Sequence, residues 1–125
     1  MATTAAGLYY KLPTFPQSTS YKYYVALYFA ELDPSVNASG LRVFDVSING
    51  VPFYQAIDVF AEVGLYTAYE IYSPNPVGPF SDHVLINLTS TAGSVLPPFL
   101  AALEIFQLFQ NPMVSATSSV DSKIR

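Results

Sequence analysis

An alternation of apolar and polar residues, closed by a tight-turn signal, restricts this chain to a β fold more than any other feature. Residues 44–49 read FDVSIN, and Gly50 follows them. A period of two puts successive side chains on opposite faces of a strand, so the segment predicts a half-buried β-strand. The Asn-Gly step tolerates positive φ and is typical of a two-residue hairpin turn. Residues 51–60, VPFYQAIDVF, are therefore predicted to form the partner strand, with Pro52 at its start or on a sheet edge.

Three further segments carry patterns that predict strands. Residues 21–32 are aromatic and β-branched with almost no polar residue, which predicts a strand buried on both faces. Residues 67–72 predict a short strand, and the proline-rich residues 73–80 after them predict a loop. Residues 82–90 alternate between apolar and polar positions, which predicts a half-buried strand. The apolar residues on its inner face are Val84, Ile86 and Leu88.

The last patterned segment is open to two interpretations. Residues 99–109 read FLAALEIFQLF, and the polar residues Glu104 and Gln107 lie three apart, as they would on one face of a helix. We favour a strand, because two prolines precede the segment and every other segment is β. Several short strands separated by turn clusters predict an all-β, antiparallel β-sandwich.

Chain length and composition agree with one sandwich domain. The chain has 125 residues, of which 51% are hydrophobic, enough to fill one core. Aromatic residues make up 15%, and the Tyr and Phe side chains among them suit half-buried strands. Residues 110–125 are small and polar, so we predict a domain over residues 1–109 followed by a linker.

Charge and residue types exclude several functions. The net charge is −4 and the five Lys and Arg residues form no basic stripe, so neither nucleic acid nor an anionic membrane surface is expected as a partner. There is no Cys and no cluster of metal ligands, so we expect no disulfide, metal or cofactor. The longest apolar run, residues 23–30, is too short to insert across a membrane. Residues 1–13 lack a basic leader and a long apolar stretch, so they do not predict a signal peptide.

Several blocks of the sequence, in order, resemble one domain family. The string FDVSING, the aspartate of IDVF, and then EVG and TAY resemble the malectin family of carbohydrate-binding domains. YYVALYFAEL before them and LPPFLAALEIF after them resemble the malectin-like ectodomains of plant receptor-like kinases and leucine-rich-repeat proteins. The resemblance covers residues 23–109. It implies a jelly-roll-like lectin sandwich that is extracellular or at the cell surface, with a cell-wall glycan or a peptide or protein as its ligand.

The resemblance also implies a binding rim and an incomplete domain. The loops at residues 33–40 and 91–98 would form the rim of the family's cleft. Malectin presents a sugar-stacking aromatic pair and an acidic residue there, but Asp33-Pro34 and Leu96 stand at those places in this chain, so the sugar chemistry is not carried over residue by residue. The first strands of the family would precede Met1. Exposed sheet edges would then favour self-association, so we expect the chain alone to be marginally stable, dimeric or aggregating.

Tyrosines are candidates for ligand contact, because a flat ring stacks on sugar C–H groups while its hydroxyl forms a hydrogen bond. The candidates near predicted turns are Tyr54, Tyr66 and Tyr69. The tyrosines assigned to core packing are Tyr23, Tyr24 and Tyr28. Packing is the simpler explanation even for the first group, since scattered exposed aromatic residues need no function.

No arrangement of residues indicates catalysis. His83 is the single histidine, and Asp82 beside it would point to the opposite face of a strand. Glu31 and Glu104 are the best candidates for a glycosidase pair, which needs carboxylates about 5–9 Å apart. Each is expected instead at a strand end or on a solvated face. We therefore predict a protein without enzymatic activity.

Two N-x-S/T triplets are candidate glycosylation sites. Asn37 lies in the predicted rim loop, and Asn87 lies on the polar side of a strand. A glycan on Asn37 would crowd the rim and favour protein recognition elsewhere on the domain. The sequence thus predicts a non-catalytic recognition module of a plant-type receptor-like protein. The alternative is an interaction or spacer domain that binds no sugar.

Overall fold

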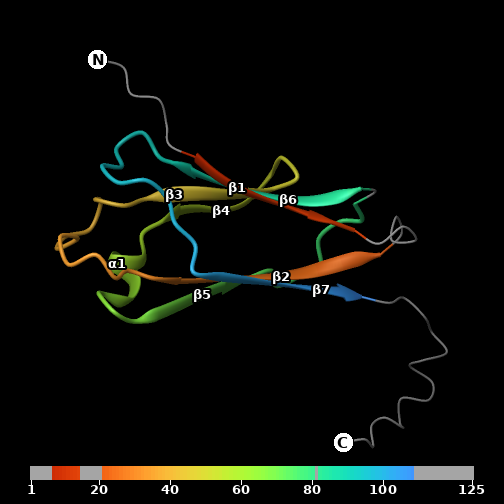
Figure 1. Ribbon diagram of the computed structural model, residues 1–125, viewed down its shortest axis with the longest axis horizontal. Coiled ribbons are helices and arrows are strands. Elements are labelled where there is room, and N and C mark those ends of the chain that lie inside the picture. Colours follow the sequence, from red (N-terminus) through yellow and green to blue (C-terminus); the bar gives the residue numbers. More distant parts are fainter. Residues whose placement is uncertain (1–6, 15–20, 81, 109–125) are drawn as a thin grey trace, which may run out of the picture.

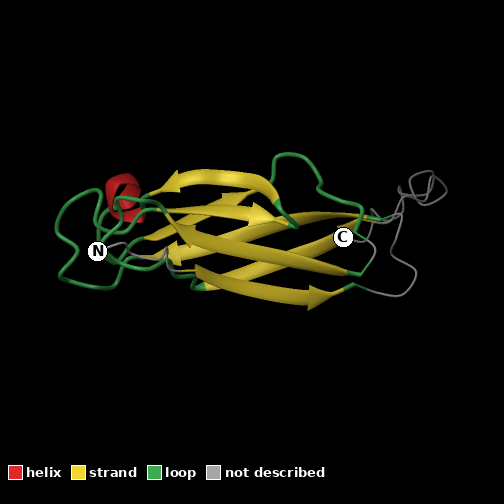
Figure 2. Cartoon of the chain, turned by 90° about the horizontal axis from the view of Figure 1, so that it is seen from above, coloured by secondary structure: helices red, strands yellow, loops and turns green. Residues whose placement is uncertain are grey.

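The computed structural model describes residues 7–14, 21–80 and 82–108 of the chain. Two antiparallel sheets face each other, and a short helix lies at one end of the sandwich (Figure 1, Figure 2). The four-stranded sheet has the order β1-β6-β3-β4, and the three-stranded sheet has the order β5-β2-β7. The elements are β1 (Gly7–Pro13), β2 (Lys22–Ala30), β3 (Phe44–Ile48), β4 (Val51–Ile57), α1 (Val59–Val63), β5 (Ala68–Tyr72), β6 (His83–Ser90) and β7 (Ala102–Leu108). The predicted all-β antiparallel sandwich is confirmed.

The predicted hairpin is present between β3 and β4. Asn49 has a φ of 48° and Gly50 a φ of 83°, the positive values that the two-residue turn requires. β4 is an edge strand, which explains how it accommodates Pro52. The register between β3 and β4 shifts twice, so the edge is bulged and its ladder irregular.

The segment after β4 differs from the prediction. The strand predicted over residues 51–60 ends at Ile57, and α1 follows it. Asp58 takes an extended conformation, and its Oδ1 accepts a hydrogen bond from Ala61 N at 3.1 Å. An aspartate at this position satisfies one of the free N–H groups of the first helical turn. The apolar residues around Asp58 resemble a strand, but the cap starts a helix.

The core fills the space between the two sheets. The inner face of β6 is as predicted, since Val84, Ile86 and Leu88 are at most 2% exposed. Three phenylalanines meet in the core: the ring centroids of Phe29 and Phe44 are 5.4 Å apart, and Phe99 lies 5.9 Å and 6.0 Å from them. Full burial of such a side chain contributes about 1.5–3 kcal/mol. These contacts hold the two sheets at a fixed spacing.

β2 is buried on one face rather than on both. Its odd-numbered residues face the core, and Leu27 is completely buried. The opposite face carries Tyr24, which is 36% exposed, and the half-buried Tyr28. The predicted core position of Tyr23 is confirmed, since it is 3% exposed, whereas the prediction of a strand buried on both faces is wrong for Tyr24 and Tyr28. The reason is that no further layer of the described chain covers the outer face of the three-stranded sheet (Figure 1).

The first and last strands lie at the edges of the two sheets. β1 was not predicted, and it pairs along its whole length with β6, from Gly7 opposite Thr89 to Pro13 opposite His83. β7 confirms the strand interpretation of residues 99–109, although it begins at Ala102. In the described part of the chain β7 pairs with β2 alone. The predicted linker over residues 110–125 lies outside the described residues.

Candidate functional site

The two loops of the predicted rim lie together at the end of the sandwich that carries α1 (Figure 1). Leu41 O accepts hydrogen bonds from Val95 N at 2.9 Å and from Leu96 N at 2.8 Å, which ties the second loop to the end of the first. Gly40 N donates to Asp58 Oδ2 at 2.7 Å, so the helix cap also holds the first loop. The rim loops are therefore brought together by backbone contacts.

A buried ion pair supports this rim. The Glu31 side chain is 2% exposed, and Arg42 Nε donates to its Oε1 at 2.8 Å. Arg42 Nη1 donates to Pro97 O at 2.8 Å, and the guanidinium lies 4.8 Å from the centre of the Phe99 ring. Glu31 has the expected position at a strand end, because it directly follows β2, but its carboxylate lies on the inner face and is buried. Nothing in the sequence around Arg42 signalled this pair.

The predicted rim residues form hydrogen bonds with other residues of the rim loops. Asp33 Oδ1 accepts from Ser35 Oγ at 2.7 Å and from Ser35 N at 2.9 Å. These hydrogen bonds, helped by the nearby Arg42 charge, lower the pKa of the Asp33 carboxyl. Leu96 is half-buried and meets the first loop through its backbone N–H. Beneath them a shallow depression of about 340 Å³ is lined by the ion pair, by Asp33 and by Phe99.

The three candidate tyrosines do not converge on one site. Tyr66 is 63% exposed at the rim end, where its N–H donates to Glu31 O at 2.9 Å. Tyr54 is half-buried on β4, and its hydroxyl donates to Tyr72 O at 3.2 Å across the gap between the sheets. Tyr69 faces inward from β5 and packs against the core, and burial raises the pKa of its hydroxyl. Of the three, Tyr66 alone presents a largely exposed ring.

The candidate catalytic residues either lie far from one another or already contact a neighbouring side chain. His83 Nδ1 lies 3.2 Å from Asp82 Oδ2, so the expectation that these side chains point to opposite faces is wrong: Asp82 precedes β6 and does not follow the strand alternation. Glu104 is paired with Ala26, five residues from Glu31 and on the outer face. That separation is about 16 Å along a strand, too far for a glycosidase pair. Among the described residues no three metal-ligating side chains cluster.

The most open set of aromatic residues lies on the outer face of the three-stranded sheet. The register puts Ala26 at the centre of this face, between Tyr72 of β5 and Glu104 of β7. One row along, Tyr24 stands opposite Phe106, and in the other direction Tyr28 stands opposite Glu70. Tyr72 is 59% exposed and Phe106 is 53% exposed. The small Ala26 side chain leaves a floor between larger neighbours.

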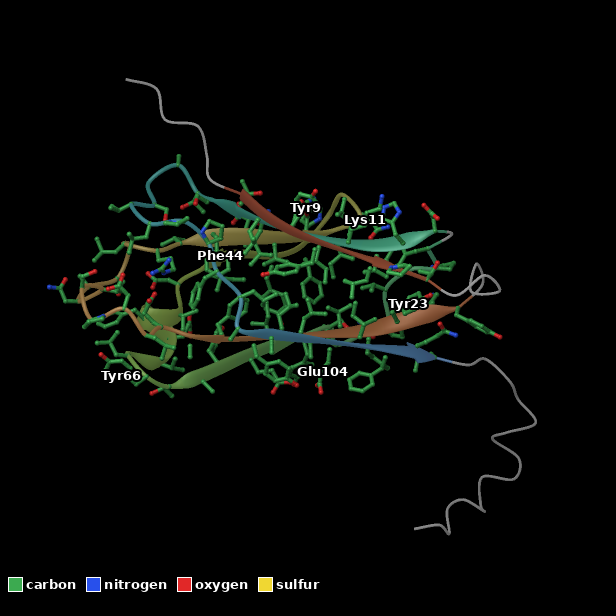
Figure 3. The ribbon with its side chains drawn as sticks, viewed as in Figure 1. Tyr9, Lys11, Tyr23, Phe44, Tyr66 and Glu104 are labelled. Atoms are coloured by element: carbon green, nitrogen blue, oxygen red, sulfur yellow. The ribbon has the colours of Figure 1, made fainter. Side chains whose placement is uncertain are left out.

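These residues line an outer-face hollow of about 390 Å³. Tyr28 donates its hydroxyl hydrogen to Glu104 Oε1 at 2.7 Å. This hydrogen bond, with desolvation and the charges of Glu104 and Glu70, raises the pKa of Tyr28 to about 12. The hydroxyl therefore remains protonated at any physiological pH and holds Glu104 in place. Figure 3 shows Glu104 pointing away from the interior of the sandwich.

The sequence contains a signal for the hollow that the prediction of a fully buried strand left unused. Residues 21–32 lack charge in their middle, which suggested burial on both faces. Within them, however, the hydroxyl-bearing Tyr24 and Tyr28 alternate with the aliphatic Val25 and Leu27. Tyrosine has an apolar body and a polar tip, so alternate tyrosines fit a face that meets water. The cross-strand partners from β5 and β7 required the structure.

Comparison with known families agrees with the fold and with the resemblance. The family model for the malectin-like domain matches residues 1–108. The chain belongs to the malectin-like domain family. The match covers more of the chain than the resemblance seen in residues 23–109, and it includes the segment that forms β1.

Similar curated proteins are plant receptors. The malectin-like chain is 32% identical over 108 residues to the nodulation receptor kinase of Pisum sativum, covering 86% of this chain and 11% of that protein. It is 48% identical over 42 residues to receptor-like protein 4 of Arabidopsis thaliana, covering 34% of this chain and 7% of that protein. It spans about a tenth of the relatives' length. The kinase in such names refers to other parts of those proteins.

A solved structure has the same fold. A chain in the crystal structure of plant peptide RALF23 in complex with FER and LLG2 superposes with a TM-score of 0.69 at 18% identity. The superposition covers 87% of this malectin-like chain and 30% of the other. At this identity the likeness supports the fold alone. In the described part of the malectin-like chain, no helix has both the length and the apolar character that crossing a membrane requires.

Proposed function

We propose that this chain is a non-catalytic ligand-recognition module in the extracellular part of a plant receptor-like protein. Its main contact surface is the outer-face hollow of the β5-β2-β7 sheet. One observation carries the proposal: the exposed rings of Tyr24, Tyr72 and Phe106 surround an open floor at Ala26. Exposed aromatic residues gathered in one place mark interaction sites, and each ring supplies a large contact area with few rotatable bonds.

The ligand is a cell-wall glycan or a peptide or protein surface. The receptor names of the curated relatives support a sensing role for the whole protein. The similar crystal structure is that of a complex with a plant peptide, which supports the peptide class here. Ring faces that stack on sugar C–H groups support the glycan class. Both classes use the same hollow, so its geometry supports recognition in either case.

The predicted rim is proposed as a second, smaller contact region. Tyr66 is its exposed ring, and Asp33 contributes its Oδ2 atom, which Ser35 does not contact and which lies 3.7 Å from Arg42 Nη2. Leu96 shapes the rim through its loop contacts, and Tyr54 and Tyr69 support the sheets from within. The charged side chains at the rim, Glu31, Asp33 and Arg42, already pair with one another. The outer-face hollow is therefore the stronger candidate for the main ligand contact.

The candidate glycosylation sites support this choice of face. Asn37 is exposed in the rim loop, and Asn87 lies on the outer face of the four-stranded sheet, where it is paired with Tyr9 and Ser47. Glycans at both sites would cover the rim and that face. Neither sequon lies on the three strands whose outer face forms the hollow. A glycopeptide map of the secreted protein tests this, and unmodified Asn37 and Asn87 would remove the argument.

Binding measurements on paired variants test the proposed function. The full chain would be screened against glucan and pectin oligosaccharides and against secreted peptides. Any ligand bound by the wild type should lose at least about tenfold in affinity in a Tyr72→Ala/Phe106→Ala variant, since truncating two ring contacts costs more than 1.4 kcal/mol. Tyr9→Ala is the matched control, because Tyr9 is 66% exposed on the opposite face. Equal binding by the wild type and the double variant would show that the hollow is not the contact surface.

A further inference from the structure

We propose that the outer-face hollow selects a positively charged side chain, a lysine or arginine of a basic peptide. This inference rests on the proposed function and names the ligand class of the same surface. It is carried by the charge, the hydrogen-bonding groups and the aromatic rings that line the hollow.

The hollow holds two carboxylates without a cation. Glu70 and Glu104 are both exposed and both line it. The ion pairs within the described ranges involve Glu31, Asp33 and Asp82, and neither lining carboxylate takes part in one. Lys22 lies on the same strand as the floor residue Ala26, four residues away, which is about 13 Å. Two negative charges therefore meet at one aromatic surface with no counter-charge from the described residues beside them.

The charged hydrogen-bonding groups of the hollow are acceptors, while the hydroxyls of Tyr24, Tyr72 and Ser73 can donate as well as accept. Carboxylates accept only, and Tyr28 has already donated its hydrogen to Glu104 at 2.7 Å. The buried Ser73 accepts from Val25 N at 3.1 Å. Lysine and arginine side chains carry donors and no acceptor, so they match this surface. A neutral sugar would leave the two charges uncompensated as it displaced their water.

The rings complete a cation-binding arrangement. Tyr24, Tyr72 and Phe106 are exposed and border the hollow. A cation over an aromatic face gains about 2- to 30-fold in affinity, depending on how far water is excluded. Arginine also stacks its flat guanidinium on rings while donating to a carboxylate. The small floor at Ala26 gives such a side chain room to lie against the sheet.

Titration calorimetry with a defined probe tests the inference. The probe is acetyl-(Arg-Gly)₄-amide, and the reference is the same peptide with citrulline, which has the shape of arginine without its charge. At about 150 mM salt the wild-type chain should bind the arginine peptide and not the citrulline peptide. Glu70→Gln/Glu104→Gln should lower the affinity about tenfold, since each exposed pair contributes a few-fold. Phe106→Ala should weaken binding as well.

A matched pair of substitutions separates the hollow from general attraction by an acidic protein. Glu62→Gln/Asp82→Asn also removes two negative charges, but from exposed positions that do not line the hollow. Because charges beyond about 8 Å are screened at this salt concentration, this control should bind as the wild type does. Equal losses in the two double variants, or equal binding of the citrulline peptide, would overturn the inference.

The same experiment distinguishes this inference from the proposed function. A glucose tetrasaccharide serves as the neutral probe. If it binds while the arginine peptide does not, and Tyr72→Ala/Phe106→Ala abolishes its binding, then the charge inference fails and the recognition function stands. If neither the aromatic nor the acidic variants change the binding of any probe, both fail. Circular dichroism of each variant confirms that the sandwich is intact.

Discussion

Replacing Arg42 with methionine is expected to lower the free energy of unfolding by about 3–5 kcal/mol. Arg42 Nε lies 2.8 Å from Glu31 Oε1 and its Nη2 lies 3.3 Å from Oε2, while the Glu31 side chain is 2% exposed. Without the guanidinium, the carboxylate would be buried, and among the described residues Asp33 N alone would still donate to it, at 3.3 Å. An unpaired buried charge is among the most destabilising changes a single substitution can make.

The double variant Glu31→Leu/Arg42→Met tests the reason for the loss. It removes both charges and leaves apolar side chains of similar size, a change that is often neutral or stabilising. The double variant should therefore recover most of the stability lost by Arg42→Met. Lys11→Met is the matched control, because Lys11 is exposed and should cost less than about 0.5 kcal/mol.

Urea unfolding followed by circular dichroism measures these differences. A loss of about 3–5 kcal/mol lowers the unfolding midpoint by about 1.5–2.5 M at a slope near 2 kcal/mol/M. Small domains have about 5–15 kcal/mol in total, so a low temperature keeps the transition of the variant within the measurable range. A loss below about 1 kcal/mol for Arg42→Met, or a double variant as unstable as the single one, would refute the reasoning.

Three further predictions follow from the fold and the hollow. The pKa of Tyr28 should be about 12 in an ultraviolet absorbance titration, and it should be nearer 10 in Glu104→Gln. The unfolded chain loses this proton near pH 10, so the free energy of unfolding should fall as the pH rises from about 10 to 12. The fall should be smaller in the variant. Gly50→Val should lower the free energy of unfolding by about 1–2 kcal/mol in urea, since Gly50 has a φ of 83°. The chain alone should elute as dimers or larger species in size-exclusion chromatography, because β7 presents an edge without proline or lysine, and a monodisperse, cooperatively melting monomer would contradict this.

Local signals in the sequence predicted most of the sandwich. The Asn49-Gly50 turn and the alternation on either side of it specify a hairpin through contacts between near neighbours. Asp58 shows where such reasoning fails: an apolar run that resembles a strand became a helix because one side chain capped it. β1 was not predicted, because its residues show no turn signal that links them to a neighbouring strand. Their partners in β6 lie far along the chain, with Pro13 opposite His83 and Gly7 opposite Thr89.

The candidate site was much harder to predict than the fold. The hollow joins Tyr72, Ala26 and Glu104, which come from three strands far apart in the chain. Their meeting depends on which strands are neighbours and on the register between them, and a one-residue slip would turn each side chain to the other face. The rim prediction depended on a family resemblance, which located the loops but not the Arg42 pair between them.

Glu31 and Glu104 show why the partner of a carboxylate matters more than its presence. Both interrupt apolar segments, so the sequence pattern alone does not distinguish them. Glu31 is buried and neutralised by Arg42, so its charge is used within the fold. Glu104 is exposed, is fixed by the Tyr28 hydroxyl and has no cation beside it in the described part of the chain, so its charge remains available to a ligand. Substitutions at the first should therefore change stability, and substitutions at the second should change binding. An outcome in which both properties changed together at either position would mean that the rim and the hollow are one coupled unit.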